Sequence, residues 1–75
     1  MTKQIQELIS AALQVPLEEI TPELTFGDIP QWDSMGHMEV MMRLEEQFGV
    51  EINADTIGEL ISIPAINAYL AAKGN

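Results

Sequence analysis

Residues 32–50 read WDSMGHMEVMMRLEEQFGV, and they carry the strongest structural signal in the chain. Between residues 34 and 48, core-forming side chains recur at the spacing of an α-helix, so one face of that helix would point into a core. This predicted core face consists of His37, Val40, Met41, Leu44 and Phe48. Asp33 precedes the helix as a preferred N-cap residue, and Gly49 follows it as a C-cap. We therefore predict a long helix over about residues 34–48.

The opposite face of this helix carries a second apolar group inside an acidic rim: Met35, Met38, Met42, Glu39, Glu45 and Glu46. A helix that is buried on one side only would carry polar residues there. Methionine is flexible and polarizable, which suits a surface that adapts to several partners. An apolar centre with a charged rim is also the usual layout of a protein interface. We interpret this face as a partner-recognition surface; the alternative is that the methionines, Met35 above all, pack against the preceding loop or the following short helix.

The remaining sequence predicts three further helices. Thr2, Asn53 and Ser62 are preferred N-cap residues that precede segments with helical apolar spacing. The expected bounds of the four helices are about 2–14, 34–48, 54–60 and 63–72. We therefore predict the all-α class: a four-helix bundle with three longer helices, a short third helix and a long loop between the first two. The length allows one domain, residues 1–75.

The loop over residues 15–32 is unusually long for a small domain. We expect its apolar residues to pin it to the core: Val15, Leu17, Ile20, Leu24, Phe26, Ile29 and Trp32. Thr21 followed by Pro22 favours a short helical turn over residues 22–24.

Composition excludes several classes of function. The chain has 12 acidic and 3 basic residues, a formal net charge of -9, which repels nucleic acid and anionic membrane surfaces. A basic patch on a protein partner would be attracted. There is no cysteine and no calcium-loop spacing of the carboxylates, so we predict no metal site. The absence of cysteine and of an apolar secretory segment is compatible with a reducing cytoplasm, so we expect a cytoplasmic protein. We also expect it to be a monomer.

Ser34 is the candidate site residue. If Asp33 is the N-cap, Ser34 takes the first helical position with its hydroxyl free, where the helix dipole would stabilise an attached phosphate. The plainer alternative is that both residues only cap the helix. Trp32 would then pack on His37 one turn later. No oxyanion loop surrounds the serine and His37 points towards the core, so we predict no catalytic residue and no enzyme.

These residues resemble the acyl carrier proteins. The resemblance covers nearly the whole chain and rests on DSM at 33–35, LEEQFGVEI at 44–52, ITPE at 20–23 and SI at 62–63. It implies a carrier to which a phosphopantetheinyl transferase adds 4′-phosphopantetheine from coenzyme A, on the hydroxyl of Ser34 beside Asp33. The thiol of this arm would hold an acyl group as a thioester. The residues of the predicted recognition face match the family's partner helix, which implies acyl-loading, ketosynthase-type or acyltransferase enzymes with basic docking patches.

Some residues depart from the family pattern. Met35 replaces the usual leucine, and Trp32 replaces the small residue common in housekeeping fatty-acid carriers. Gly36 and His37 also differ from that group, and Gly36 would weaken the first helical turn by up to about 1 kcal/mol relative to alanine. These features resemble stand-alone carriers of specialised pathways, such as polyketide, hybrid peptide or unusual acyl-unit biosynthesis.

Two alternatives remain open at this point. A carrier with the same arm could be loaded with an amino acid instead of an acyl group. An unmodified helical adaptor could bind a basic partner through Met35, Met38 and Met42. The adaptor would not need the Ser34 hydroxyl, whereas either carrier would.

Overall fold

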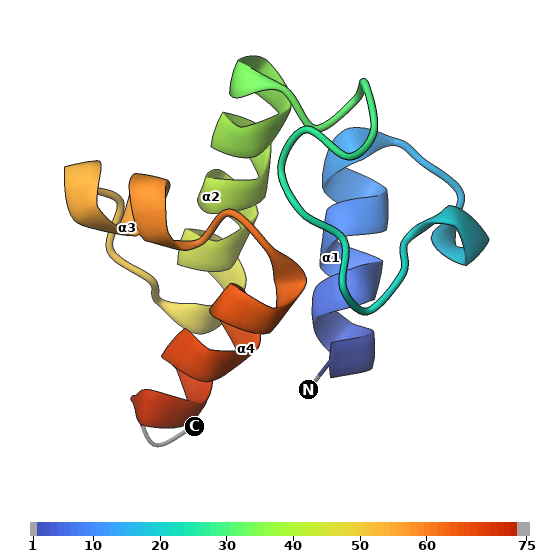
Figure 1. The fold of residues 1–75 in the computed structure, drawn as a ribbon. Helices are drawn as coiled ribbons and strands as arrows, with labels where there is room; N and C mark the ends of the chain where they lie inside the picture. Colours follow the sequence, from blue (N-terminus) through green and yellow to red (C-terminus); the bar gives the residue numbers. More distant parts are fainter. Residues whose placement is uncertain (1, 74–75) are drawn as a thin grey trace.

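Four α-helices and one 3-10 turn make up the computed structural model, which describes residues 2–73 (Figure 1). Their bounds are α1 (Thr2–Leu13), η1 (Leu17–Glu19), α2 (Ser34–Phe48), α3 (Ala54–Glu59) and α4 (Ile63–Ala72). The predicted all-α class is confirmed, with three longer helices, a short third helix and a long loop between the first two. Within the described range, no helix is long and apolar enough to cross a membrane.

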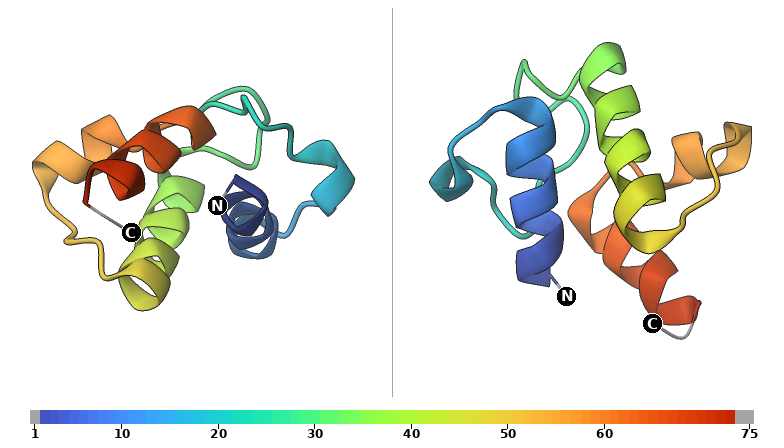
Figure 2. Two further views of the ribbon diagram at one scale, coloured as in Figure 1. Left: turned by 90° about the horizontal axis from the view of Figure 1, so that it is seen from below. Right: turned by 180° about the vertical axis from the view of Figure 1, so that it is seen from behind.

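The core forms where α1, α2 and α4 pack together. Helices α1 and α2 lie side by side and run in opposite directions, with α4 at the end where α1 begins and α2 ends (Figures 1 and 2). The buried residues of α2 include four of the five predicted core-face residues, His37, Val40, Met41 and Leu44, and Phe48 is half-buried against the core. The other two helices contribute Ile5, Leu8, Ile9, Leu13, Ile63, Ile66 and Leu70.

Side chains close most of the helix ends as predicted. The carboxylate of Asp33 accepts the N–H of Gly36 at 2.9 Å, and Ser62 accepts the N–H of Ala65 at 3.1 Å. Asn53 forms a reciprocal capping box with Thr56, in which each side chain accepts the other residue's backbone N–H. These caps confirm the predicted starts of α2, α3 and α4.

The predicted cap at Thr2 is wrong. Thr2 lies inside α1, and its hydroxyl accepts the side-chain amide of Asn67 on α4 at 2.8 Å. Its polar group therefore ties α1 to α4. At the other end, α1 stops at Leu13, because Gln14 takes a left-handed conformation with φ 56°.

The long loop is tied down by α1. The side chain of Gln6 donates to the carbonyl of Ile20 at 2.6 Å, and the hydroxyl of Ser10 donates to the carbonyl of Val15 at 2.6 Å. Four of the apolar residues expected to pin the loop are buried, and Ile29 is half-buried: Val15, Ile20, Leu24, Trp32 and Ile29. Leu17 and Phe26 are instead exposed by 42% and 38%. At the predicted short turn over residues 22–24, a single turn closes, in which Leu24 donates to the carbonyl of Thr21 at 3.1 Å. No helix is assigned there, and the 3-10 turn of the loop forms earlier, at Leu17–Glu19.

The same loop pairs with the connection between α3 and α4. Thr25 and Ser62 form an antiparallel bridge, in which Phe26 donates to the carbonyl of Ile61 at 2.7 Å and Ile63 donates to that of Leu24 at 3.0 Å. This pairing fixes Phe26 and Ile61 close together, at the edge of the site described next.

Candidate functional site

Ser34 begins α2, and its side chain is exposed. Asp33 supplies the cap, so the hydroxyl of Ser34 is not needed to satisfy the helix. Within residues 2–73, no hydrogen bond engages that hydroxyl, whereas Ser10 and Ser62 use theirs for the loop and for the start of α4. Of the three serines in the chain, Ser34 alone therefore presents a free hydroxyl at the start of a long helix.

The turn into α2 is held by a close approach at Gly36. A Cβ atom at this position would collide with the carbonyl oxygen of Gln31 and lie 2.8 Å from Cδ2 of Leu13. Residue 36 must therefore be glycine for the loop to pass so close to α2. The sequence-based interpretation treated Gly36 only as a weakness in the helix, and the structure shows why it is there.

Replacing Gly36 by alanine is expected to destabilise the protein by about 1–3 kcal/mol, although alanine is the better helix former. The physical reason is the collision with the Gln31 carbonyl, which forces the loop away from the start of α2. Urea denaturation followed by circular dichroism measures the change. Gly58, which also lies within a helix, provides the control, since a Cβ there meets nothing within 4 Å and Gly58→Ala should stabilise α3. Equal stabilisation by both substitutions would contradict this reading.

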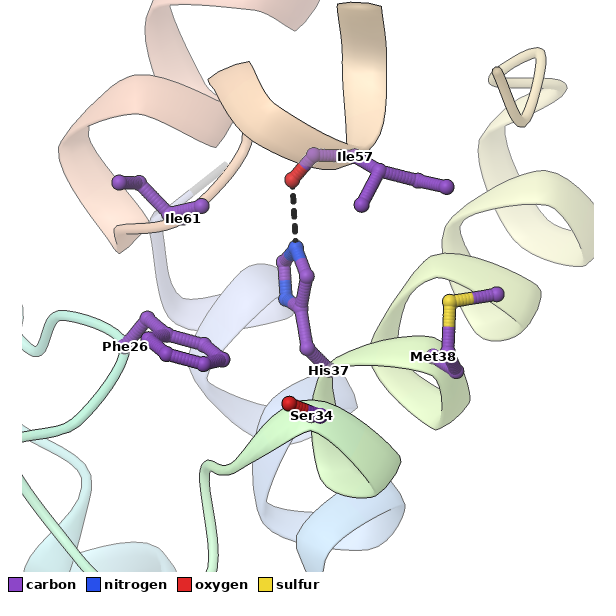
Figure 3. A pocket seen from close by; sticks show the side chains of 6 residues that line it. All are labelled: Phe26, Ser34, His37, Met38, Ile57 and Ile61. Carbon is purple, nitrogen blue, oxygen red and sulfur yellow. Dashed lines mark hydrogen bonds between the residues drawn. The ribbon is translucent and has the colours of Figure 1, made fainter. Parts of the chain in front are cut away.

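An apolar cavity of about 320 Å³ opens beside Ser34 (Figure 3). The residues that line it come from the loop, from α2, from α3 and from the α3–α4 connection: Phe26, Ser34, His37, Met38, Ile57 and Ile61. This volume is at the lower end of the range for small-molecule sites. Sequence reasoning did not identify Phe26, Ile57 or Ile61, because the pairing of Thr25 with Ser62 that gathers this wall leaves no mark in the local pattern.

His37 stands at the base of the cavity with both ring nitrogens engaged. Its Nδ1 accepts the indole N–H of Trp32 at 3.0 Å. Its Nε2 lies 2.8 Å from the carbonyl oxygen of Ile57 in α3, a contact drawn as a dashed line in Figure 3. The predicted packing of Trp32 on His37 is confirmed and takes the form of a hydrogen bond. Because neither nitrogen is left for the serine, His37 does not act as a base for Ser34.

The outer face of α2 exposes its methionines. Met35, Met38 and Met42 are exposed by 84%, 40% and 50%. The alternative that Met35 packs against the loop is therefore wrong, and Met38 is the one that also lines the cavity.

The acidic rim of that face is partly compensated. Glu45 and Glu46 are exposed, whereas Glu39 is half-buried with its carboxylate 3.5 Å from Nε of Arg43. Exposed ion pairs of this i, i+4 type contribute only about 0.3–0.5 kcal/mol. Among the described residues, Glu45 and Glu46 form no ion pair, so the C-terminal half of α2 keeps two exposed negative charges. Among residues 2–73, no group of three or more acidic or histidine side chains is placed to hold a metal ion.

Comparison with known proteins agrees with this geometry. The family model described as "Phosphopantetheine attachment site" matches residues 3–70. An acyl carrier protein from Nitratidesulfovibrio vulgaris is 32% identical over 71 residues, which cover 95% of this chain and 93% of the relative. An acyl carrier protein from Thermobifida fusca is 32% identical over 66 residues, covering 88% and 84% of the two chains. "Acyl carrier protein 3" from Ralstonia nicotianae is 35% identical over 77 aligned positions, covering 95% and 86%.

The family model spans most of the chain, and each of these relatives aligns with most of the chain as well. The chain is a member of the acyl carrier protein family, non-catalytic proteins that carry a 4′-phosphopantetheine prosthetic group.

Proposed function

We propose that this protein carries acyl groups on a 4′-phosphopantetheine arm attached to Ser34, and that it presents them to biosynthetic enzymes. The observation that carries the proposal is the free, exposed Ser34 hydroxyl at the first position of α2. The hydroxyls of Ser10 and Ser62 are engaged in hydrogen bonds that hold the fold.

The residues around Ser34 fit the prosthetic group. Its Oγ supplies the bridging oxygen of the phosphodiester, and the positive end of α2 stabilises the phosphate charge. Asp33 keeps its carboxylate on the N–H of Gly36, so that it caps the helix and holds the turn. When bound, the group supplies a thiol that holds an acyl group as a thioester. The cavity of about 320 Å³ beside Ser34 gives the apolar part of such a group a place to rest.

We propose that the exposed face of α2 is where partner enzymes dock. Its methionines supply flexible apolar contact, and its carboxylates attract and orient a basic patch. The residues assigned to this face are Met35, Met38, Met42, Glu39, Glu45 and Glu46. Expected partners are a phosphopantetheinyl transferase and acyl-loading, ketosynthase-type or acyltransferase enzymes.

The pathway is proposed to be a specialised one, such as polyketide biosynthesis. Support comes from Trp32, Gly36 and His37, which differ from the pattern of housekeeping fatty-acid carriers. Trp32 and His37 are hydrogen-bonded to each other, and Gly36 lets the Gln31 carbonyl approach α2. A cytoplasmic monomer is the proposed state, because the transferase draws on coenzyme A and the recognition face must stay open to many enzymes in turn.

Mass spectrometry tests the attachment. The purified chain is incubated with coenzyme A and a transferase of broad specificity, and its intact mass is measured. We expect a gain equal to one 4′-phosphopantetheine group, which peptide fragmentation places on Ser34. A protein that gains no mass, or that carries the group on Ser10 or Ser62, would refute the proposal.

A further inference from the structure

A buried chain of hydrogen bonds runs from Trp32 through His37 to Ile57, across the base of the cavity. We infer that His37 is a positioning residue for the attachment reaction at Ser34. In its neutral form the ring joins Trp32, in the loop before Ser34, to Ile57 in α3 through two hydrogen bonds, and we call this pair of bonds the clasp. A second proton on the ring breaks the clasp. The role in attachment rests on the proposed function of Ser34, whereas the clasp itself does not.

The two partners of the ring fix its protonation state. The indole N–H of Trp32 can only donate, so Nδ1 of His37 must be the acceptor at 3.0 Å. The carbonyl of Ile57 can only accept, so Nε2 must carry the proton and donate it at 2.8 Å. A protonated ring carries N–H groups on both nitrogens. Its Nδ1–H would then face the Trp32 N–H, with two donors and no acceptor between them.

Burial makes this conflict costly. His37 is 4% exposed and Trp32 is fully buried, so water does not reach the pair to satisfy either donor. The imidazole also packs in a T-shaped arrangement with the ring of Phe26, with centroids 5.5 Å apart and ring planes at 79°. Protonation therefore leaves an unpaired donor inside the core, and moving the indole or the histidine away relieves it.

The clasp holds two parts of the site in place. Trp32 lies two residues before Ser34, and its backbone is tied to Ile29 and to Gly27 by bonds of 3.1 Å each. On the other side, Ile57 belongs to α3, a helix of six residues that is too short to be stable on its own. Within residues 2–73, no second hydrogen bond joins α2 to α3.

Other charged groups around the ring are engaged elsewhere or exposed. In the loop, the carboxylates of Asp28 and Asp33 accept the N–H groups of Thr25 and Gly36. None of the ionisable groups on the packed elements is hydrogen-bonded to the imidazole, and His37 is the only titratable residue lining the cavity. Those on the helices are Lys3 and Glu7 on α1, Glu39, Arg43, Glu45 and Glu46 on α2, Asp55 and Glu59 on α3, and Tyr69 on α4.

Fluorescence tests the clasp directly, because Trp32 is the only tryptophan and His37 the only histidine of the chain. The pH is lowered from about 8 to about 5, the range in which histidine side chains act as pH switches in proteins. We expect a single change in Trp32 emission, together with faster amide hydrogen exchange in α3 and unchanged exchange in α1. His37→Gln, whose amide both accepts and donates but does not titrate, should show neither change. A transition that persists in His37→Gln, or α3 exchange that ignores pH, would overturn the clasp.

Attachment rates test the positioning role. The rate of phosphopantetheine transfer is measured for the wild-type chain and for His37→Gln across the same pH range. Dividing the wild-type rate by the His37→Gln rate cancels the transferase's own pH dependence. We expect a ratio near one at about pH 8 that falls about fivefold or more on acidification. His37→Phe, which breaks both bonds, should transfer about tenfold more slowly at every pH. A constant ratio would overturn the role, even if His37→Phe fails to fold.

The two tests separate the inference from the proposed function. If no chain accepts the group on Ser34, the proposed function fails, and fluorescence and exchange still decide whether the clasp exists. If attachment occurs with a constant ratio, the proposed function stands and His37 has no positioning role.

Discussion

Replacing Ser34 by alanine is expected to abolish the mass gain from coenzyme A completely while leaving the fold unchanged. The hydroxyl is exposed and makes no hydrogen bond within residues 2–73, so its loss should change the unfolding free energy by less than about 0.5 kcal/mol. Asp33 still caps α2 in the variant. Intact mass after incubation with the transferase measures the first effect, and thermal unfolding by circular dichroism measures the second.

Ser10→Ala is the matched control. This substitution removes a hydroxyl that donates to the carbonyl of Val15, so it should cost some stability but leave the mass gain intact. A full mass gain in Ser34→Ala would show that the group sits elsewhere. Loss of folding in Ser34→Ala would show that the hydroxyl has a structural role, although it is exposed and makes no hydrogen bond within residues 2–73.

Comparing Ser34→Ala with Met42→Glu separates a carrier from an unmodified adaptor. Met42→Glu places a carboxylate in the apolar centre of the α2 face, where a docking partner would have to desolvate it. In a carrier, Ser34→Ala stops function and Met42→Glu weakens it through poorer docking. In an adaptor that binds through its methionines, Met42→Glu stops binding and Ser34→Ala has no effect. The order of the two effects therefore distinguishes the hypotheses without knowledge of the cargo.

The helices were predictable because their signals are local. In α2, the spacing of Val40, Met41 and Leu44 and the caps at either end lie within one stretch of sequence, and the structure confirms them. The exposure of Met35, Met38 and Met42 also agrees with this spacing, since two apolar stripes on opposite sides of a helix cannot both face one core. Such periodic patterns can be recognised in the sequence without knowledge of the tertiary fold.

The cavity could not be predicted, because its walls meet through long-range pairing. Phe26 and Ile61 are 35 positions apart and come together through two backbone hydrogen bonds that any residue types could make. Apolar loop residues normally indicate burial, so Phe26 was expected to pin the loop to the core. It lies instead at the surface of the cavity, with 38% of its area exposed. Its place depends on the connection after α3.

Gly36 and His37 show where propensity misleads. Helix propensity assigns Gly36 only a cost, yet the space between α2 and the Gln31 carbonyl admits no Cβ atom. His37 falls on the core face by its spacing, and only the positions of Trp32 and Ile57 reveal that both of its nitrogens are bonded. In both cases a tertiary neighbour from the loop or from α3 decides the residue type.

Replacing Trp32 by alanine is expected to cost about 3–5 kcal/mol, which is most of the stability of a domain this small. Trp32 is the largest fully buried side chain in the described range, and it anchors the loop that leads into Ser34. Its removal would leave a cavity and would also deprive Nδ1 of His37 of its donor. Urea unfolding followed by far-ultraviolet circular dichroism measures the cost, since the variant has no tryptophan fluorescence.

Trp32→Phe divides that cost into packing and hydrogen bonding. Phenylalanine keeps an aromatic ring in the core but has no N–H, so we expect a loss of about 1–3 kcal/mol, smaller than for alanine. If the two variants are equally unstable, the indole N–H rather than the ring anchors the loop. The hydrogen bond from Trp32 to His37 would then account for the loss of stability. If Trp32→Ala unfolds at nearly the same urea concentration as the wild-type chain, the hydrogen bonds of the loop to α1 are enough to hold it. Trp32 would then not be the anchor of the loop that leads into Ser34.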